Sequence, residues 1–549
     1  EKDDLEAMGM LKVDVLALGM LSAIRRGLEL MNHWRGTARQ MHQVPNDDEQ
    51  VFDMICDADT VGVFQIESRA QMSMLPRLKP RTYEDLVIEV AIVRPGPIQG
   101  GMVHPYLKQR ERLRKGLPIL YEKEELRPAL ERTLGVPIFQ EQVMQIAMIA
   151  AEFTADEADQ LRRAMAAWKR KGGLGKFHDK LVDGMVKRGY ERPFAEAIFK
   201  QVLGFGDYGF PESHAASFAL LVCVSGWLKR HEPACFLAAL LDAQPMGFYS
   251  PSQLVQDARR HGVEVRPVDV TRSEFDSSLE ARSPDAPGAP RMPPGTEARY
   301  ADRLGHPEQP AVRLGLRRVS SLSDAGAQRL LAARAQAPFT STEDLALRAE
   351  LDGKDMAALA AADALMSLSG HRRQQVWDAT AQRRAPALLK GVPINEPALQ
   401  LPVAPEGEEI VGDYAALGLT LRRHPLALLR SRLARMNLMS AEQLRSLPSG
   451  QTVRACGIVQ GRQRPQTANG TIFVTLEDET GNVNVIVWSH VIEAWREPLL
   501  KSKLLAVQGT WQRDVDSGGE VRHVVATGFR DLTPMLGRLA QSNRSRDFH

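Results

Sequence analysis

Apolar and polar positions divide the chain into a helical first half and a mixed second half. From about residue 22 to about residue 265, apolar residues mostly return every three to four positions, which is the period of amphipathic helices. Before this region, apolar and polar residues alternate at 11–15, and a period of two predicts a short strand. Residues 257–270 predict a helix, a turn and a strand. The first half is therefore expected to be mainly α-helical.

The second half contains two weakly patterned segments and two compact units. Residues 281–311 are rich in proline, glycine and alanine, and residues 381–410 are rich in proline, so both predict linkers or insertions. Between them, LGLRRVSSLSDAGAQRLLAARA has the rhythm of a helix-hairpin-helix unit, which grips DNA backbone, but its hairpin has one glycine where two are more typical. From 452 to 530, five short strands with a helix before the last two favour an OB-fold barrel.

Composition narrows the class of protein. A chain of 549 residues is too long for one core, and with 44% apolar and 25% charged residues it is typical of a globular protein. The net charge of +2 requires any nucleic-acid surface to be local. Four scattered cysteines without a CxxC pair favour a reduced, cytoplasmic compartment and argue against structural zinc. No apolar run reaches the roughly 18 residues of a membrane span. The opening EKDDLEAMG, which lacks an initiator methionine, is interpreted as the start of an N-terminally truncated fragment.

Asp14 and Lys12 are candidates for chemistry on a phosphate. Asp14 has apolar neighbours on both sides in the predicted strand, where a carboxylate is costly unless it is paired or binds a cation such as Mg²⁺. Lys12 lies two residues earlier, on the same strand face, where it could meet a phosphate. The alternatives are a strand-end aspartate that faces water and a surface ion pair, and spacing alone favours these alternatives.

Two cationic stretches are candidates for binding polyphosphate or DNA. Arg162 and Arg163 follow an apolar helix, and with Lys169, Arg170 and Lys171 they form a predicted cluster without an acidic residue. A solvated helix face is the alternative. In the OB-like region, Phe473 and a further four side chains are candidates for gripping a single strand by stacking and charge, with barrel core as the alternative for the aromatic ones. These four are Trp488, Trp511, Arg462 and Arg464.

A glycine-punctuated segment at 204–217 carries Gly209, Ser213, His214 and Ser217 before an apolar helix. Together with paired arginines, such a Gly/Ser/His loop suits a polyphosphate ligand. The chain has no GxSxG nucleophile elbow and no GxxxxGK[ST] phosphate loop, which disfavours a serine hydrolase and a P-loop ATPase.

These stretches resemble, in order, the motifs of bacterial C-family DNA polymerases, the family of the DNA polymerase III alpha subunit. The matching motifs are KVDVLALG (12–19), GVFQIESR (62–69), RPGPIQGGM (94–102), FQEQVMQIA (139–147), LRRAM (161–165), DYGFPESHAASFAL (207–220) and LGLTLRRHPL (417–426). The resemblance covers nearly the whole chain. With the periodicity, it implies a multidomain, mainly α protein with a C-terminal β OB-fold. The expected parts are the end of an α/β palm at 1–24, fingers at 25–270, a linker or insertion at 271–311, a helix-hairpin-helix-like domain at 312–380, a linker and helical segment at 381–445, the OB-fold at 446–535 and a tail at 536–549.

The resemblance also implies roles for individual residues. Asp14 matches the third of three palm aspartates that hold two Mg²⁺ ions, and the first two lie upstream in the family. Lys12, Arg162 and Arg163 match residues that contact the incoming dNTP triphosphate. The segment 204–217 matches the part of the fingers beside the nascent base pair. The implied activity is transfer of a nucleotide from a dNTP to a primer 3′-hydroxyl on primer-template DNA, a reaction this fragment is not expected to perform alone.

Two differences from the replicative subunit of the family favour its error-prone, translesion branch, which serves damage-induced mutagenesis and DNA repair. In INEPALQLPVAPEGEE (394–409), Pro402 and Ala404 spoil a clamp-binding motif that would begin at Gln400, and the chain ends soon after the OB-fold. That branch works with a Y-family-like accessory protein, a RecA-like accessory protein and, through them, the sliding clamp. The alternatives are the high-fidelity replicative subunit and, for this fragment, a non-catalytic DNA-binding module.

Overall fold

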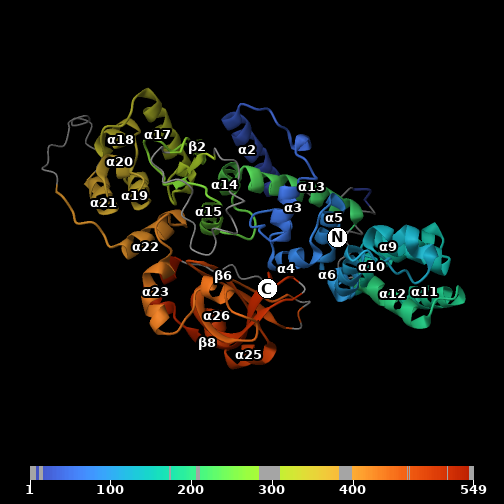
Figure 1. The fold of residues 1–549 in the computed structure, drawn as a ribbon. Helices are drawn as coiled ribbons and strands as arrows, with labels where there is room; N and C mark the ends of the chain where they lie inside the picture. Colours follow the sequence, from blue (N-terminus) through green and yellow to red (C-terminus); the bar gives the residue numbers. More distant parts are fainter. Residues whose placement is uncertain are drawn as a thin grey trace.

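The computed structural model places most of the chain in helices that lead to one β-barrel (Figure 1). It describes residues 8–10, 16–171, 175–205, 211–282, 309–381, 399–465, 468, 470–515 and 517–542, without the side chains of 166–171, 176 and 542. No helix in these ranges is both long and apolar enough to cross a membrane. The four cysteines, Cys56, Cys223, Cys235 and Cys456, are free and buried.

The first half is helical, as predicted. Its α-helices are α2 (Leu18–Arg35), α3 (Glu49–Cys56), α4 (Arg69–Leu78), α5 (Tyr83–Ile92), α6 (Pro95–Gln99), α7 (Val103–Arg114), α8 (Arg127–Leu130), α9 (Gln140–Ala151), α10 (Ala155–Lys171), α11 (Gly175–Lys187), α12 (Arg192–Phe205), α13 (Glu212–His231), α14 (Pro233–Asp242) and α15 (Pro251–Arg260). Short 3₁₀ turns lie at Met41–Gln43, Glu124–Leu126 and Glu131–Thr133. The short strand predicted at 11–15 lies outside the described residues, and α2 begins soon after it, at Leu18.

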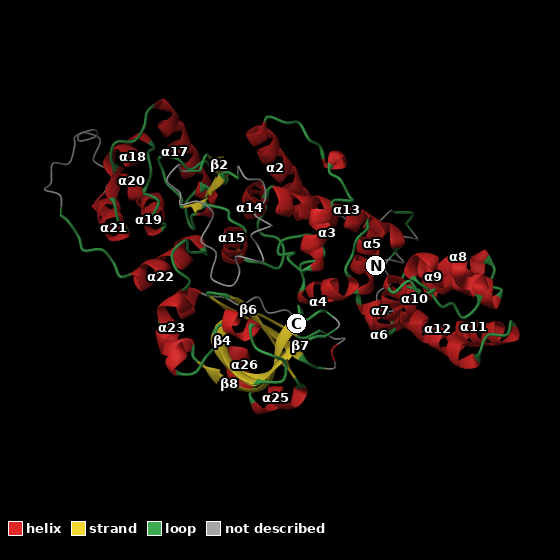
Figure 2. Ribbon diagram, in the orientation of Figure 1, coloured by secondary structure: helices red, strands yellow, loops and turns green. Residues whose placement is uncertain are grey.

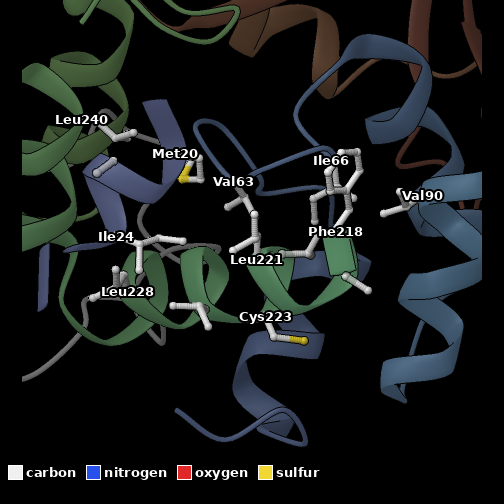
Figure 3. Close-up of a cluster of buried hydrophobic side chains, with 14 of the residues drawn as sticks. Met20, Ile24, Val63, Ile66, Val90, Phe218, Leu221, Cys223, Leu228 and Leu240 are labelled. Atoms are coloured by element: carbon white, nitrogen blue, oxygen red, sulfur yellow. The ribbon is translucent and has the colours of Figure 1, made fainter. Parts of the chain in front are cut away.

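Helix α13 is the central element of this half. All residues from 221 to 229 are buried, so this part of the helix is enclosed on every side by α2, α3, α5 and α14. Figure 3 shows Phe218, Leu221 and Leu228 of α13 among side chains from α2 and the loop after α3. The last turn ends with three basic residues, which suit the negative end of the helix dipole. Because α13 is fixed along its length, its exposed N-terminal turns are held in a defined direction.

A small mixed sheet joins the helical half to the next unit. Its strands are β1 (Val265–Arg266), β2 (Ser278–Glu280) and β3 (Ala311–Arg313), in the order β1-β3-β2. Strand β1 is parallel to β3 and β2 is antiparallel to it, with Leu279 opposite Val312. Within the linker predicted at 271–311, residues 278–280 form β2 and residue 311 begins β3. The turn and strand predicted at 257–270 are confirmed.

The predicted helix-hairpin-helix unit follows the sheet. It contains a 3₁₀ turn at Leu316–Arg318 and α17 (Asp324–Gln336), α18 (Thr342–Arg348), α19 (Gly353–Ala361), α20 (Met366–Ser369) and α21 (Arg372–Ala381). The single hairpin glycine, Gly326, is required by close packing, because a Cβ there would lie 2.2 Å from Asp355 Oδ2. Asp355 is buried and accepts hydrogen bonds from the Ser323 N–H and hydroxyl, both at 2.9 Å. The hairpin is thus held by the protein's own carboxylate.

A group of largely buried ion pairs attaches the first of the next three helices, and the segment that follows it, to this unit. These helices are α22 (Glu406–Leu417), α23 (Pro425–Arg435) and α24 (Ala441–Arg445). Arg422 bridges Asp363 and Asp413 at 2.9 Å each, and Arg372 contacts Asp413 and lies 2.9 Å from Glu409. The LGLTLRRHPL segment therefore serves as a structural joint between the hairpin unit and the barrel.

The chain ends in a closed five-stranded barrel of the predicted kind (Figure 2). Its elements are β4 (Thr452–Gln463), β5 (Ile472–Asp478), β6 (Gly481–Val487), α25 (Ser489–Ala494), α26 (Arg496–Lys501), β7 (Leu504–Arg513) and β8 (Arg522–Asp531), followed by a 3₁₀ turn at Thr533–Leu536 and by α27 (Leu539–Ser542). The barrel order is β4-β5-β6-β8-β7, and two helices precede the last two strands. Alternate residues such as Val474 and Val485, which pair across β5 and β6, fill the interior.

Glu89 on α5 is a buried carboxyl group without a hydrogen-bond partner among the described residues. Burial raises its pKa well above the usual value. Because the unfolded chain then loses this proton at lower pH than the folded chain, stability falls as pH rises above about 4.3. We expect Glu89→Gln to remove this fall. The free energy of unfolding of the variant, relative to wild type, should then grow by up to about 1.4 kcal/mol for each pH unit.

Urea unfolding between pH 4 and pH 8 tests the Glu89 prediction. Glu29→Gln is the matched control, because Glu29 is exposed and paired with Arg25 on α2. The control should keep the wild-type dependence of stability on pH. An unchanged pH dependence in Glu89→Gln would show that the carboxyl group finds a partner in solution.

Candidate functional site

The first candidate residues lie beyond what the structure describes. Lys12, Asp14 and Gly209 are outside the described residues, as are the side chains of Lys169, Arg170 and Lys171. Their predicted roles therefore stay predictions.

Arg162 and Arg163 lie side by side on α10 and share one carboxylate. Arg162 Nη2 lies 2.8 Å from Asp159 Oδ1, and Arg163 Nε lies 2.8 Å from Asp159 Oδ2. The predicted absence of an acid is thus wrong, because residues three and four apart meet on one helix face. The Arg162 hydrogen bond in particular lowers the pKa of Asp159.

The shared carboxylate gives the two arginines a usable geometry. Their side chains remain 42% and 70% exposed, so an approaching anion can reach both. Asp159 holds the two guanidinium groups next to each other and leaves a net positive charge on the three side chains. Two adjacent guanidinium groups offer the multiple parallel donors that phosphate oxygens accept.

Ser213, His214 and Ser217 lie on the first two turns of α13, not in a loop as predicted. All three are exposed, whereas Ala215, Phe218 and Ala219 of the same turns are buried. The Ser217 hydroxyl donates to the Ser213 carbonyl at 2.9 Å, and this bond fixes the serine rotamer. The three polar side chains therefore form a rigid exposed surface at the start of the buried helix.

Neighbouring helices anchor this surface. The Glu212 N–H donates to Glu141 Oε2 at 3.2 Å, which ties α13 to the start of α9, and Arg132 pairs with the Glu212 carboxylate. The Tyr83 hydroxyl on α5 donates to the Ala216 carbonyl at 2.6 Å. Because α9 also packs against α10, it is the shared neighbour of the arginine pair and of the α13 surface. Sequence reasoning did not single out Glu141 or Tyr83, since neither belongs to a charge cluster.

The GVFQIES motif also supports α13. Phe64 meets Phe218 edge to face, with ring centroids 5.2 Å apart. Gln65 has a left-handed backbone with φ of 59°, and its side-chain oxygen accepts a hydrogen bond from Arg94. Phe64 therefore packs against α13, and Gln65 fixes the loop that carries it.

One buried group has the composition of a metal site but already holds a cation. Ligand atoms of Asp59, Asp257 and His261 lie within 4.8 Å of one another. The Lys229 ammonium group contacts Asp257, lies 3.7 Å from Asp59 Oδ1 and donates to the Val61 carbonyl at 3.0 Å. Burial opposes a charge on His261, yet Asp59 and Asp257 raise its pKa. This group is therefore an ionic cluster of the core, and it does not fit a divalent ion.

The barrel residues divide into core and surface. Trp511 is 3% exposed and lies in the barrel core, so the prediction that it stacks on bases is wrong. Arg462 is also buried and donates to the carbonyls of Leu499, at 2.6 Å, and Ser502, which makes it a structural residue and not a DNA contact. Arg464 and Trp488, which is 48% exposed, remain available to a ligand.

Comparison with known proteins gives three family matches in the order of the domains. The bacterial DNA polymerase III alpha subunit finger domain matches residues 20–189, a helix-hairpin-helix motif matches 262–375, and an OB-fold nucleic acid binding domain matches 442–532. The helix-hairpin-helix match begins before the predicted 312, so that it includes the small sheet. The predicted multidomain, mainly α fold with a C-terminal barrel is confirmed.

Curated relatives match over the whole chain. Proteins named error-prone DNA polymerase from Burkholderia pseudomallei and Ralstonia pickettii are each 56% identical, over 561 and 563 residues, and one from Alkalilimnicola ehrlichii is 54% identical over 549 residues. Each match covers 100% of this chain and 50% of the relative, so the chain spans about half the length of these relatives. The chain belongs to the bacterial DNA polymerase III alpha subunit family. Within that family, these matches place it beside the proteins named error-prone DNA polymerase.

Proposed function

We propose that the full-length protein is a DNA-directed DNA polymerase that performs error-prone translesion synthesis. The observation that carries this proposal is the match of the entire chain, at 56% identity, to error-prone DNA polymerases. The chain would supply the fingers, the hairpin unit and the barrel. Its expected ligands are dNTPs, primer-template DNA and, at the barrel, single-stranded template. The four free, buried thiols support a cytoplasmic location.

The described residues support binding and orientation of the nucleotide. Arg162 and Arg163 would hold the triphosphate through parallel donors. The polar start of α13, anchored on α5 and α9, would flank the nascent base pair. Lys12 would add a further positive charge on the phosphates.

Magnesium enters the proposal through Asp14, whose carboxylate is the donor type that this ion prefers. Among the described residues, the buried cluster around Asp59 does not fit a metal ion, because Lys229 already occupies it. When bound, two Mg²⁺ ions would neutralise phosphate charge and activate the primer hydroxyl. The remaining ligands would come from carboxylates upstream of this chain.

The error-prone branch further implies partners. A Y-family-like accessory protein, a RecA-like accessory protein and, through them, the sliding clamp would connect the polymerase to damaged templates. These partners are proposed from the resemblance and from the spoiled clamp motif at 400–404.

Primer extension by the full-length protein tests the proposed function. Templates with and without an abasic site are compared in the presence of Mg²⁺ and dNTPs. Extension past the lesion supports an error-prone polymerase, whereas extension on undamaged template only would support a replicative enzyme. DNA binding without any extension would point to a non-catalytic DNA-binding module.

Arg163→Ala is expected to weaken use of the incoming nucleotide. Loss of one charge-assisted contact to the triphosphate removes about 1.5–3 kcal/mol, so kcat/KM for dNTP should fall by roughly 10- to 100-fold, with a raised KM. Steady-state single-nucleotide insertion measures both constants.

Arg192→Ala is the matched control for Arg163, because Arg192 is 58% exposed and also pairs with an aspartate, Asp183. This control should leave kcat/KM within about twofold of wild type. Equal losses of kcat/KM in both variants would show that Arg163 acts only through its positive charge at the surface and not through a specific contact with the triphosphate.

A further inference from the structure

Helix α4 of the fingers lies directly against the barrel (Figure 1). Arg69, its first residue, donates from Nη1 to the carbonyls of Val474 and Val485 at 3.2 and 3.3 Å, and from Nη2 to the Val485 carbonyl at 3.4 Å. Val474 and Val485 are paired residues of β5 and β6. One side chain from the fingers thus joins the second and third strands of the barrel.

The Arg69 guanidinium group also covers an aromatic ring. Its central carbon lies 5.0 Å from the centroid of the Phe473 ring on β5. Burial lowers the pKa of Arg69 to about 9. Its contacts are two neutral carbonyls and a ring, which offset only part of the cost of taking a cation out of water. The contact is therefore specific in geometry but modest in strength.

A second arginine of α4 reaches a loop of the barrel. Arg77 Nε lies 3.0 Å from Asp514 Oδ2, in the turn between β7 and β8. Both side chains keep part of their surface exposed, 33% and 22% respectively, so this ion pair adds little stability alone. Together, Arg69 and Arg77 place α4 across β5, β6 and the β7–β8 turn.

These are the parts of an OB-fold that hold a nucleic-acid strand. Oligonucleotides bind across the second and third strands, between the loop joining strands one and two and the loop joining strands four and five. In this barrel the second and third strands are β5 and β6, and the last of these loops is the β7–β8 turn. Phe473 faces outward there, where a base would stack.

We propose that α4 and a single strand of DNA compete for the β5–β6 face of the barrel, so that Arg69 and Arg77 form a latch that holds the barrel closed against the fingers. This inference deepens the proposed function by assigning the template-strand site and its regulation. A base on Phe473 needs the space that the Arg69 guanidinium group occupies. A strand on the face therefore requires α4 to leave, and the released arginines become available to the phosphates.

Binding of a fluorescent oligo(dT) to the 549-residue chain tests the competition. The variant Arg69→Ala/Arg77→Ala loses two positive charges, which by itself weakens DNA binding. If the latch competes with DNA, the variant should instead bind more tightly, by about fivefold or more, as expected for coupling energies of this kind. Fluorescence anisotropy at fixed salt measures the change.

The matched control removes two positive charges elsewhere. Arg81 and Arg127 are 55% and 52% exposed and pair with acids away from the barrel. Arg81→Ala/Arg127→Ala should bind oligo(dT) as wild type does or more weakly. Equal weakening in both double variants would overturn the proposal, as would an absence of oligo(dT) binding by every variant. Thermal melting verifies that each variant is folded.

A second measurement follows the latch itself. Dyes attached at Lys115→Cys on the fingers side and Glu493→Cys on α25 report the distance between the two parts, and both positions are exposed. Energy transfer should change when oligo(dT) binds to the otherwise wild-type chain, and it should already be changed in Arg69→Ala/Arg77→Ala without DNA. If oligo(dT) binds and energy transfer stays unaltered, the proposed competition between α4 and DNA is contradicted. Adding Phe473→Ala to the Arg69→Ala/Arg77→Ala variant should reverse its gain in affinity for oligo(dT).

Neither measurement needs catalysis. A polymerase that extends primers but shows no latch would contradict this inference alone. A latch in a protein without synthesis would contradict the proposed function alone.

Discussion

Asp14→Asn in the full-length protein is expected to abolish measurable primer extension, with a loss of at least about a thousandfold in kcat. The asparagine has nearly the same size as the aspartate but lacks the negative charge that a divalent ion requires. A metal ion supplies several kcal/mol of transition-state stabilisation, and about 4 kcal/mol corresponds to a thousandfold in rate. Primer extension under single-turnover conditions measures the loss on undamaged template.

The matched control for Asp14 is Asp47→Asn, which makes the same chemical change at an exposed position before α3. It should leave the rate unchanged. DNA binding by Asp14→Asn should also remain near the wild-type value, because in the proposed function the fingers and the barrel hold the DNA. Retained synthesis in Asp14→Asn would remove this residue from the metal site and leave it as a solvent-facing carboxylate.

Lys229→Met is expected to cost about 3–5 kcal/mol of folding free energy, since it breaks a buried ion pair from one side. The side chains of Lys229 and Asp59 are each only 3% exposed, and Asp257 is 13% exposed. Methionine fills most of the lysine volume, so the loss comes mainly from two buried carboxylates that have lost their cation. Urea unfolding followed by tryptophan fluorescence measures the change near Trp227, which lies on the same helix.

The surface pair of Lys501 and Glu497 provides the control, because both side chains are about three-quarters exposed. Lys501→Met should change the unfolding free energy by less than about 1 kcal/mol. The penalty in Lys229→Met should shrink on acidification, when His261 can carry the missing positive charge. A small penalty that does not depend on pH would mean that water reaches the carboxylates.

The class of fold could be predicted because it depends on local periodicity. The period of three to four residues predicted the helical half, and the five strands with a helix before the last two predicted the barrel. The positions of Trp511 and Asp159 could also have been predicted from the sequence. Trp511 follows Leu505 and Val507 at even spacing on β7, so it points into the same interior, and Asp159 precedes the paired arginines by one helical turn.

Other features depend on contacts that no local pattern contains. Arg462 bonds to carbonyls 37 and 40 residues further along the chain, at the end of α26, after a bulge in β4 has changed the strand register. Arg69 likewise meets Val474 across 405 residues, a contact that the GVFQIESR motif does not indicate. The positive charge of Arg462, which suggested a DNA contact in the sequence, is satisfied by backbone oxygens in the fold. Charge alone therefore overstated the DNA-binding surface of the barrel.

The enclosure of residues 221–229 of α13 means that the chain tolerates changes in length less well here than elsewhere. The helix has 20 residues and spans about 30 Å, from the exposed serines and histidine at one end to Lys229 near the other. Removing one residue between these ends would turn the polar surface by about 100° and draw it back by about 1.5 Å. Since the enclosed portion cannot rotate to compensate, evolution can exchange side chains along α13 but cannot readily add or delete a residue there.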